Sequence, residues 1–113
     1  MRIAICDDNE IQIGIFMHRI NNFLKRNGDI KALITPYDKG QPLIDDVADG
    51  EWYDIVVLDI VLREENGIEV AKELRLNGYD GNIIFWTAHK EYVFEALDLL
   101  PIHYIIKGSE NGR

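Results

Sequence analysis

Short apolar runs alternate along the chain with longer segments that carry apolar residues at helical spacing. The runs are rich in β-branched and aromatic residues, which is typical of strands, and each run but the last is followed by a helical segment. The pattern therefore predicts five strands in a βα alternation. The predicted strands are Arg2–Cys6, Ala32–Thr35, Ile55–Leu58, Ile83–Trp86 and His103–Ile106.

Two of the predicted helices have recognisable ends. Asn9 or Asp8 can cap the first helix, and Asn27-Gly28 supplies its stop. The residues predicted on its inner side are Ile11, Ile15, Ile20, Phe23 and Leu24. A later helix begins near Gly67 and closes at Gly78. The residues predicted to face inward from this helix are Ile68, Ala71 and Leu74.

The third strand indicates how the sheet is built. Ile55–Leu58 shows no polar alternation, which suits a strand that is covered on both faces in a parallel sheet. We therefore predict the α/β class, with an open, doubly wound, five-stranded parallel sheet in the order 2-1-3-4-5. Ligands bind such sheets beyond the carboxyl ends of the strands, and in this order the binding point lies between the first and third strands.

Three carboxylates are expected at that point. Asp7 and Asp8 follow the first strand, and Asp59 follows the third. Two like charges at roughly 4 Å repel by about 4 kcal/mol at an effective dielectric constant of about 20, so this group should hold either a proton or a cation. A hard divalent ion such as Mg²⁺ is the simpler solution, because it prefers oxygen ligands. Taken alone, Asp7 and Asp8 would equally suit capping of the first helix.

Two further polar residues end the fourth and fifth strands, at the same edge of the sheet. These residues are Thr87 and Lys107. Alone, each has a simpler explanation, as a structural threonine and a solvated lysine. A cation, a hydroxyl and an ammonium around one carboxylate are what an acyl phosphate needs, because the cationic groups neutralise the phosphoryl oxygens. Together they predict that Asp59 is phosphorylated beside Thr87 and Lys107.

The charge balance narrows the classes of partner. The chain has 12 Lys and Arg residues against 20 Asp and Glu, a net charge of −8. This balance argues against binding of this segment to nucleic acid or an anionic membrane, because phosphate contacts come mainly from Lys and Arg. Cys6 is the single cysteine, so a reducing compartment fits best. With neither a leader nor an apolar run of transmembrane length in the sequence, we expect a soluble, cytoplasmic domain.

Four stretches of the chain match one known family: RIAICDDNE, DIVVLDIVLREENGIEVAKELR, IIFWTAHKEYVFEAL and HYIIK. Over nearly its whole length the chain thus resembles the receiver domain of bacterial two-component response regulators. The resemblance implies a flavodoxin-like fold over residues 1–108. It also implies a phosphorylation switch rather than an enzyme, with a sensor histidine kinase as the phosphate donor.

The resemblance implies a role for each acidic residue at the edge of the sheet. Asp59 would accept phosphate from a phosphohistidine of the kinase. Asp8, Asp59 and the backbone carbonyl of Val61 would bind Mg²⁺, and Asp7 would support the metal through water.

The resemblance also implies how the signal leaves the site. Thr87 and Lys107 would contact the phosphoryl group, and Tyr104 matches the aromatic switch position, whose ring moves inward when the threonine is drawn toward the phosphate. The fourth helix and fifth strand would then present a changed surface, on which a homodimer could form. The run TAHKEYVFEALDLLPIHYIIK is most similar to regulators with a LytTR-type DNA-binding domain, which implies control of transcription by a domain outside this segment.

The chain departs from the family at three places. Gly108 follows Lys107 where the family usually has proline, so we expect this peptide to be trans. Arg63 stands where the family often has proline, which favours a more mobile loop. Residues 109–113 form a polar tail, or the start of a truncated fifth helix, and the final helix is expected to be missing. Its loss would uncover apolar sheet surface beside the first and fifth strands and favour low stability, self-association or a swapped element.

Two other functions share parts of this pattern. A haloacid-dehalogenase-like phosphatase also uses an aspartate nucleophile and Mg²⁺, but that family expects a second aspartate where Val61 stands. A flavodoxin-like electron carrier shares the sheet order, but its phosphate loop is rich in Ser, Thr and Gly. The segment that follows the first strand here, Asp7-Asp8-Asn9-Glu10, would repel a phosphate.

Overall fold

In the computed structural model, which describes residues 1–96, 99 and 102–107, strands and helices alternate along the chain as predicted. The strands are β1 (Arg2–Cys6), β2 (Leu33–Tyr37), β3 (Ile55–Leu58), β4 (Asn82–Thr87) and β5 (Ile102–Ile106). The helices are α1 (Glu10–Arg26), α2 (Gly40–Ala48), α3 (Gly67–Leu76) and α4 (Val93–Ala96), the last preceded by a 3₁₀ turn at Lys90–Tyr92. Among the described residues, no helix has the length and apolar content needed to cross a membrane.

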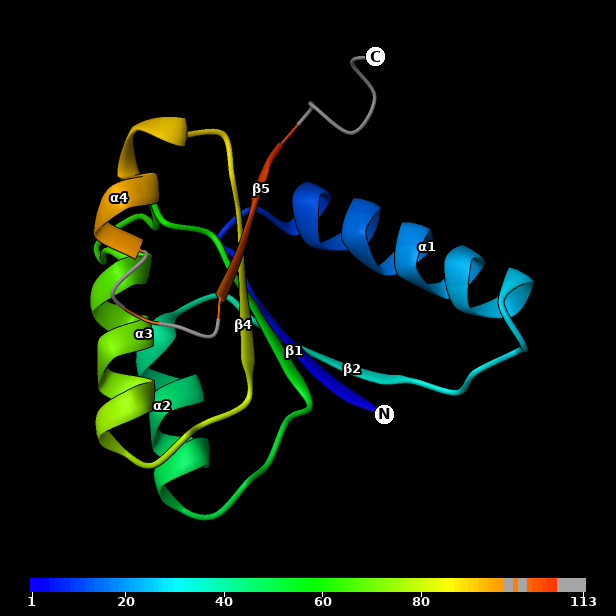
Figure 1. Ribbon diagram of the computed structural model, residues 1–113, viewed down its shortest axis with the longest axis horizontal. Coiled ribbons are helices and arrows are strands. Elements are labelled where there is room, and N and C mark those ends of the chain that lie inside the picture. The colour runs from blue at the N-terminus through cyan, green and yellow to red at the C-terminus, as the bar shows by residue number, and fades with distance from the viewer. Residues whose placement is uncertain (97–98, 100–101, 108–113) are drawn as a thin grey trace.

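The strands form one parallel sheet in the order β2-β1-β3-β4-β5, which confirms the predicted fold class. Figure 1 shows α1 on one face of this sheet and α2, α3 and α4 on the other. The strands β1 and β3 have the predicted bounds, and β4 and β5 are slightly longer than predicted. The strand β2 continues through Pro36 to Tyr37, two residues past its predicted end. A proline is tolerated there because β2 lies at the edge of the sheet.

The sheet is packed on both faces, and β3 contributes to both apolar layers. Val56 and Leu58 belong to the layer beneath α2 and α3, whereas Val57 belongs to the layer beneath α1. All three are buried, as predicted for a central strand. The predicted inward face of α3 is also confirmed, because Ile68, Ala71 and Leu74 are fully buried.

The predicted ends of α1 are confirmed. Asn9 caps the helix, and its side-chain oxygen accepts the backbone N–H groups of Ile11 and Gln12 at 2.9 and 3.2 Å. The chain leaves the helix through Asn27 and Gly28, and Gly28 has a φ of 100°, in the left-handed region that favours glycine.

The prediction for the inner side of α1 is mostly wrong. Leu24 is buried and Ile20 packs against the sheet, but the other three predicted residues are exposed by 36% or more: Ile11, Ile15 and Phe23. The residues that contact the sheet with Ile20 are Ile13 and Phe16. Positions 13, 16, 20 and 24 share one helix face, whereas positions 11 and 15 lie on nearly the opposite face. Apolar residues on both sides of the helix concealed its orientation.

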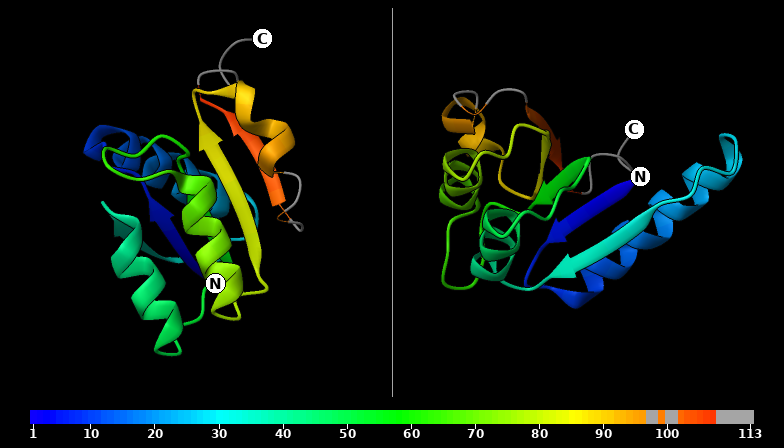
Figure 2. Two further views of the ribbon diagram at one scale, coloured as in Figure 1. Left: turned by 90° about the vertical axis from the view of Figure 1, so that its left-hand side faces the viewer. Right: turned by 90° about the horizontal axis from the view of Figure 1, so that it is seen from below.

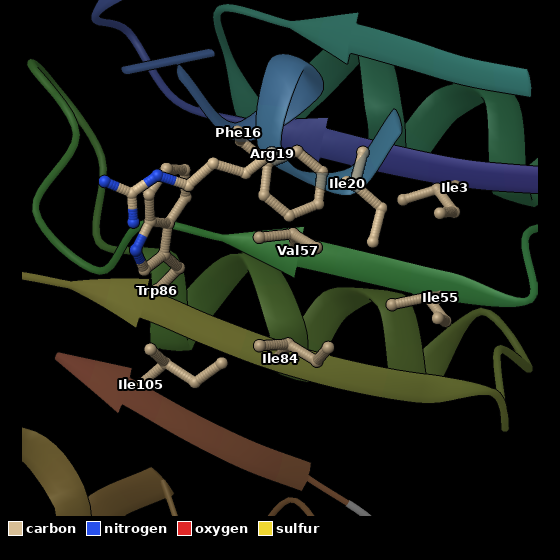
Figure 3. A pocket seen from close by; sticks show the side chains of 9 residues that line it. All are labelled: Ile3, Phe16, Arg19, Ile20, Ile55, Val57, Ile84, Trp86 and Ile105. Carbon is tan, nitrogen blue, oxygen red and sulfur yellow. The ribbon is translucent and has the colours of Figure 1, made fainter. Parts of the chain in front are cut away.

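An apolar groove of about 260 Å³ lies between α1 and the sheet (Figure 3). Phe16 and Ile20 of α1 form one wall, and side chains of the sheet, including Trp86 and Ile105, form the floor. Figure 2 shows how the described helices are divided, since α1 lies against this face while α2, α3 and α4 share the other face. Among the described residues, Ile3 of β1 and Ile105 of β5 line this groove, and the expected exposure of the sheet through a missing helix stays a prediction. The expected absence of a fifth helix concerns residues 109–113, which lie outside the described residues.

Arg75, in the last turn of α3, ties together two connections at the end of the sheet where the strands begin. Its guanidinium donates to the carbonyl oxygens of Tyr79 at 2.9 Å and Gly81 at 2.8 Å, in the α3–β4 turn. It also donates to the carbonyl of Leu99, in the α4–β5 connection, at 3.1 Å. The α4–β5 connection is thereby anchored at the end of the molecule opposite the strand ends that carry the acidic residues.

Candidate functional site

The carboxyl ends of β1 and β3 bring Asp7 and Asp59 together. The two strands are neighbours, and Cys6 pairs with Leu58 at their last common position. The N–H of Asp59 donates to the carbonyl of Cys6 at 3.0 Å, which holds the residue after β3 against the end of β1. Asp7 and Asp59 are only 1% and 8% exposed, so their charges need compensation from within the protein.

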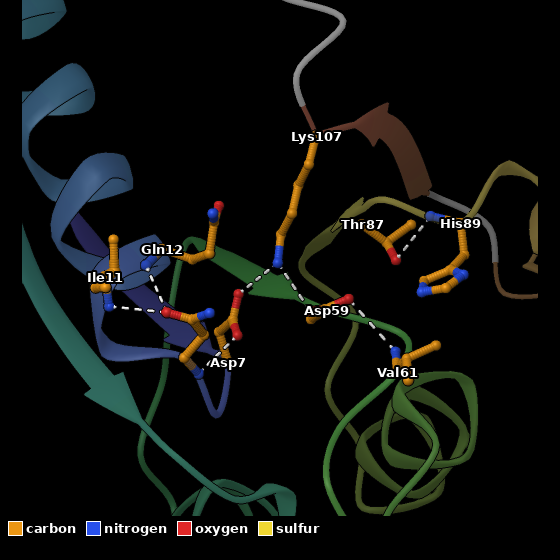
Figure 4. Close-up of polar contacts among 9 residues, drawn as sticks. Asp7, Ile11, Gln12, Asp59, Val61, Thr87, His89 and Lys107 are labelled. Carbon is orange, nitrogen blue, oxygen red and sulfur yellow. Dashed lines mark hydrogen bonds and ion pairs between the residues drawn. The ribbon is translucent and has the colours of Figure 1, made fainter.

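Lys107 supplies that compensation. Its side chain reaches from the end of β5 across β4, and Nζ lies 2.8 Å from Oδ2 of Asp7 and 2.8 Å from Oδ2 of Asp59 (Figure 4). The same Nζ lies 5.5 Å from the centroid of the Trp86 ring. The backbone N–H of Lys107 donates to the carbonyl of Thr87 at 2.6 Å, which fixes the base of the side chain. We refer to Asp7, Asp59 and Lys107 as the ionic cluster.

Burial and hydrogen bonding combine differently in the pKa values of Asp7 and Lys107. The pKa of Asp7 is raised, because burial disfavours its charge more than the hydrogen bond from Lys107 favours it. For Lys107, burial acts to lower the pKa, but hydrogen bonds to Asp59 and Asp7 outweigh burial, and its pKa is raised. The ammonium is therefore firmly charged at neutral pH, whereas the charge of Asp7 is incompletely compensated.

Asp8 lies outside the ionic cluster. Its side chain is partly exposed and lines a polar hollow of about 440 Å³, together with Lys39, Arg63 and Glu65 of the β2–α2 and β3–α3 loops. Within the part of the chain that the structure describes, no three His, Cys, Asp or Glu side chains form a group that could hold a metal ion. The cation between Asp7 and Asp59 is the Lys107 ammonium.

The loop after β3 is folded closely against Asp59. A Cβ on Gly67, the first residue of α3, would lie 2.0 Å from the carbonyl oxygen of Asp59 and 2.8 Å from Cα of Ile60. Any side chain at this position would therefore force the backbone to shift. Within the loop, the N–H of Val61 faces Oδ1 of Asp59 at 3.4 Å, and Asn66 caps α3 with its side chain. The start of α3 at Gly67, where the sequence predicts it, thus sets how near the helix approaches the site.

Thr87 and Tyr104 meet at the backbone of His89. The buried hydroxyl of Thr87 accepts the N–H of His89 at 3.3 Å, as Figure 4 shows, and the hydroxyl of Tyr104 donates to the His89 carbonyl. The ring of Tyr104 packs 6.1 Å from that of Phe85, between centroids. The structure therefore links the two predicted switch residues through the β4–α4 loop.

Sequence reasoning missed one polar contact beside the site. The carboxylate of Glu65 accepts the N–H of Gly40, the first residue of α2, at 2.7 Å. The signal that could have revealed it is Lys39, which precedes α2 and has no side-chain oxygen with which to cap the helix. An acceptor from another part of the chain was therefore needed.

The comparison with known families decides what this site belongs to. The family model described as the response regulator receiver domain matches residues 3–113. The chain belongs to this family. Receiver domains are phosphorylation switches that sensor histidine kinases phosphorylate, and they bind Mg²⁺. The phosphatase and electron-carrier alternatives are accordingly not favoured.

The curated relatives of this receiver domain are regulators. It is 32% identical over 116 residues to the sensory transduction protein LytR of Staphylococcus saprophyticus, and this match covers the whole chain and 42% of that protein. It is 42% identical over 55 residues to the transcriptional regulatory protein LytR of Staphylococcus aureus, over 49% of this chain and 22% of that protein. The chain therefore spans less than half the length of these relatives.

Solved structures share the fold. The response regulator TrrA of Thermotoga maritima, crystallised in complex with Mg²⁺ and BeF, is 27% identical, with a TM-score of 0.70 over 95% of this chain and 86% of that chain. A receiver domain from Methylobacillus flagellatus, 17% identical, reaches a TM-score of 0.78 over 96% of this chain and 86% of that chain. At that lower identity the likeness concerns the fold alone.

Proposed function

We propose that this receiver domain accepts a phosphoryl group on Asp59 from a phosphohistidine of a sensor histidine kinase. A carboxylate oxygen of Asp59 forms the bond to phosphorus while the N–P bond of the phosphohistidine breaks and the released imidazole takes up a proton. The observation that carries the proposal is the position of Lys107, whose ammonium lies 2.8 Å from Asp59. A fixed positive charge beside the acceptor stabilises the charge of an incoming phosphoryl group without further rearrangement.

We propose that Asp7, Asp8, Asp59 and the backbone carbonyl of Val61 hold Mg²⁺. Carboxylate and carbonyl oxygens are the ligands that this ion prefers, and when bound it neutralises charge on the phosphoryl oxygens. The raised pKa of Asp7, which burial causes, supports this assignment, because it marks a carboxylate whose charge one ammonium does not fully compensate.

Thr87 and Tyr104 are proposed to carry the change outward. The Thr87 hydroxyl turns from the His89 backbone to a phosphoryl oxygen, which alters the β4–α4 loop that also holds the Tyr104 hydroxyl. The Tyr104 ring follows inward, and the surface formed by α4 and β5 changes. This is a shift between two arrangements that the protein already has, biased by the new charge.

The changed surface is proposed to control an output outside this segment. The LytR relatives are more than twice as long as the chain, and one is named a transcriptional regulatory protein. We therefore propose a LytTR-type DNA-binding output in the cytoplasm, with the α4–β5 surface forming a homodimer on phosphorylation or releasing the output domain. With its net charge of −8, this segment leaves DNA binding to that domain.

Beryllofluoride titration with Mg²⁺ tests the proposal, because beryllofluoride on an aspartate mimics a phosphoryl group. The chain has two tryptophans, so a Trp52→Phe background leaves Trp86, beneath Lys107, as the reporter of the site. We expect a saturable change of Trp86 fluorescence that requires both Mg²⁺ and beryllofluoride and is lost in Asp59→Asn. Incubation with a phosphorylated kinase should add one phosphoryl group to the parent chain, detected by intact mass. An equal response of parent and Asp59→Asn would refute the assignment.

A further inference from the structure

Glu65 lies in the loop after β3 but makes its side-chain contact with α2. Oε1 accepts the N–H of Gly40 at 2.7 Å, across 25 residues of sequence. Within the described part of the chain, Lys39 makes no capping hydrogen bond with its own side chain. The first N–H groups of a helix have no partner within the helix, and its N-terminus favours a negative charge. Glu65 therefore supplies from a distance the cap that Lys39 lacks.

The N-terminus of α2 is a fixed point to which Glu65 can be attached. A Cβ on Gly40 would lie 2.4 Å from Cγ2 of Val70, so α2 begins in close contact with α3. The same Cβ would lie 3.1 Å from Oε2 of Glu65, so the carboxylate is confined as well. The absence of a side chain at residue 40 lets both contacts form.

The backbone of Glu65 closes the loop that begins at Asp59. Its carbonyl accepts the N–H of Leu62 at 3.2 Å, and an isolated bridge pairs Val61 with Asn66. Leu62 is buried, which holds the middle of the loop in the core. Glu65 thus belongs to the short hairpin that carries Val61, and its side chain ties that hairpin to α2.

We propose that Glu65 is a positioning residue, which holds the backbone of Val61 in place beside Asp59 by tethering the β3–α3 loop to the N-terminus of α2. The inference rests on the proposed function of Asp59, because Val61 is there a ligand of Mg²⁺. A simpler role is that Glu65 only caps α2. In that case any other cap on the helix would replace it.

A double-mutant cycle distinguishes a Glu65 that tethers the β3–α3 loop from a Glu65 that only caps α2. Glu65→Ala removes the hydrogen bond that serves as both tether and cap. Lys39→Ser adds a local cap for the N–H of Gln41, since Pro42 has none, at a residue whose backbone is already extended, as capping requires. The single variant Lys39→Ser measures the effect of losing the positive charge at residue 39. Glu64→Ala, the exposed neighbour, is the matched control for loss of a carboxylate. Glu65→Gln keeps an oxygen that can accept from Gly40 and provides a variant expected to fold even if Glu65→Ala does not.

Two quantities are measured in each variant: the thermal midpoint, and the Mg²⁺ concentration for half-maximal Trp86 response with beryllofluoride. We expect Glu65→Ala to lower the midpoint and to raise the Mg²⁺ concentration by roughly fivefold, the net scale of one typical intramolecular hydrogen bond. Adding Lys39→Ser should restore the midpoint but not the response to Mg²⁺. Glu64→Ala should change neither, and Glu65→Gln should stay within about twofold of the parent.

Restoration of both quantities by Lys39→Ser would overturn the proposal and leave Glu65 as a cap. An unchanged Mg²⁺ response in Glu65→Ala, when the parent responds, would overturn it too. If the parent itself gives no response, the proposed function fails instead. Hydrogen exchange of the backbone amides of residues 60–66 then still tests whether Glu65 tethers the loop. If it does, these amides should exchange faster in Glu65→Ala/Lys39→Ser than in Lys39→Ser.

Discussion

The ammonium of Lys107 is 2.8 Å from a carboxylate oxygen of Asp7 and 2.8 Å from one of Asp59, so one residue after β5 joins the ends of β1 and β3. The three side chains are at most 14% exposed, which makes their charges strongly interdependent. Replacing any one of them should therefore change the electrostatic environment of the other two.

Lys107→Met should destabilise the fold, because it leaves two carboxylates facing each other without a cation. We expect the free energy of unfolding to fall by about 2 kcal/mol at pH 7, less than for a fully buried pair since water reaches the site. The loss should be smaller at pH 5 than at pH 7, because the raised pKa of Asp7 favours its protonation as the pH falls. Urea unfolding at both pH values measures this, with Lys31→Met, 91% exposed at its side chain, as control. Equal losses for the two variants would contradict the prediction.

Asp7→Asn should stabilise the fold at neutral pH. Burial raises the pKa of Asp7 in the folded protein, so the folded state binds this proton more tightly than the unfolded state. That contribution is fully present below the ordinary pKa of 3.8 and is lost as the pH rises through the folded pKa. The advantage of Asp7→Asn should therefore grow as the pH rises above 3.8 and then level off. A difference that does not vary with pH would count against this account.

Gly67→Ala should disturb the site through the backbone. The new Cβ would lie 2.0 Å from the Asp59 carbonyl oxygen, so α3 or the loop must move, and we expect a loss of roughly 2–3 kcal/mol. On α1, a Cβ at Gly14 would meet no described atom within 4 Å, and Gly14→Ala should gain about 0.5–1 kcal/mol. Thermal unfolding of the pair gives the comparison. Similar midpoints for both variants would show that the close approach is unimportant.

Cys6 should react with thiol reagents only when the protein opens. Burial, and to a lesser extent the charge of Glu65, raises the pKa of the thiol to about 12. The stability linked to the protonated thiol is fully present below its ordinary pKa of 9.0 and is lost as the pH rises toward 12. Labelling by a disulfide reagent at pH 8 should therefore rise with urea in step with unfolding. Rapid stoichiometric labelling without urea would refute this.

The groove between α1 and the sheet should promote self-association of this segment. Ile105, on the floor of the groove, is 41% exposed, and Ile105→Lys should lower the apparent mass in light scattering at high protein concentration. Ile11→Lys, at a residue of α1 that is 73% exposed and does not line the groove, is the control. A parent chain that stays monomeric at every concentration would contradict the prediction.

The fold could be predicted because the apolar third strand and the alternation of strands with helices both indicate a covered parallel sheet. An apolar strand such as Ile55–Leu58 indicates a covered parallel strand, and the alternation of elements indicates a doubly wound sheet, whose 2-1-3-4-5 order matches the flavodoxin-like fold that the family resemblance implies. The orientation of α1 could not be predicted, because apolar residues on both its sides gave no unique face. The end of β2 was misplaced at Pro36, since only the finished sheet shows that this strand lies at an edge.

In the site, the residues that follow the strands could be predicted to lie together, but the contacts of long side chains could not be predicted. Asp7 and Asp59 follow adjacent strands, so their proximity comes directly from the topology. That Lys107 bonds both, and that Asp8 instead lines a separate hollow, depends on rotamers and on what fills the space between. The contact of Glu65 with Gly40 could not be predicted either, because the two residues are 25 positions apart and no local sequence pattern connects them.

Arg75 holds Leu99, Tyr79 and Gly81 by their carbonyl oxygens, a group that every amino acid provides. The attachment of the α4–β5 connection therefore does not depend on which side chains that connection displays. A substitution of Leu99 can therefore change its side chain while the hydrogen bond from Arg75 to its backbone carbonyl stays available.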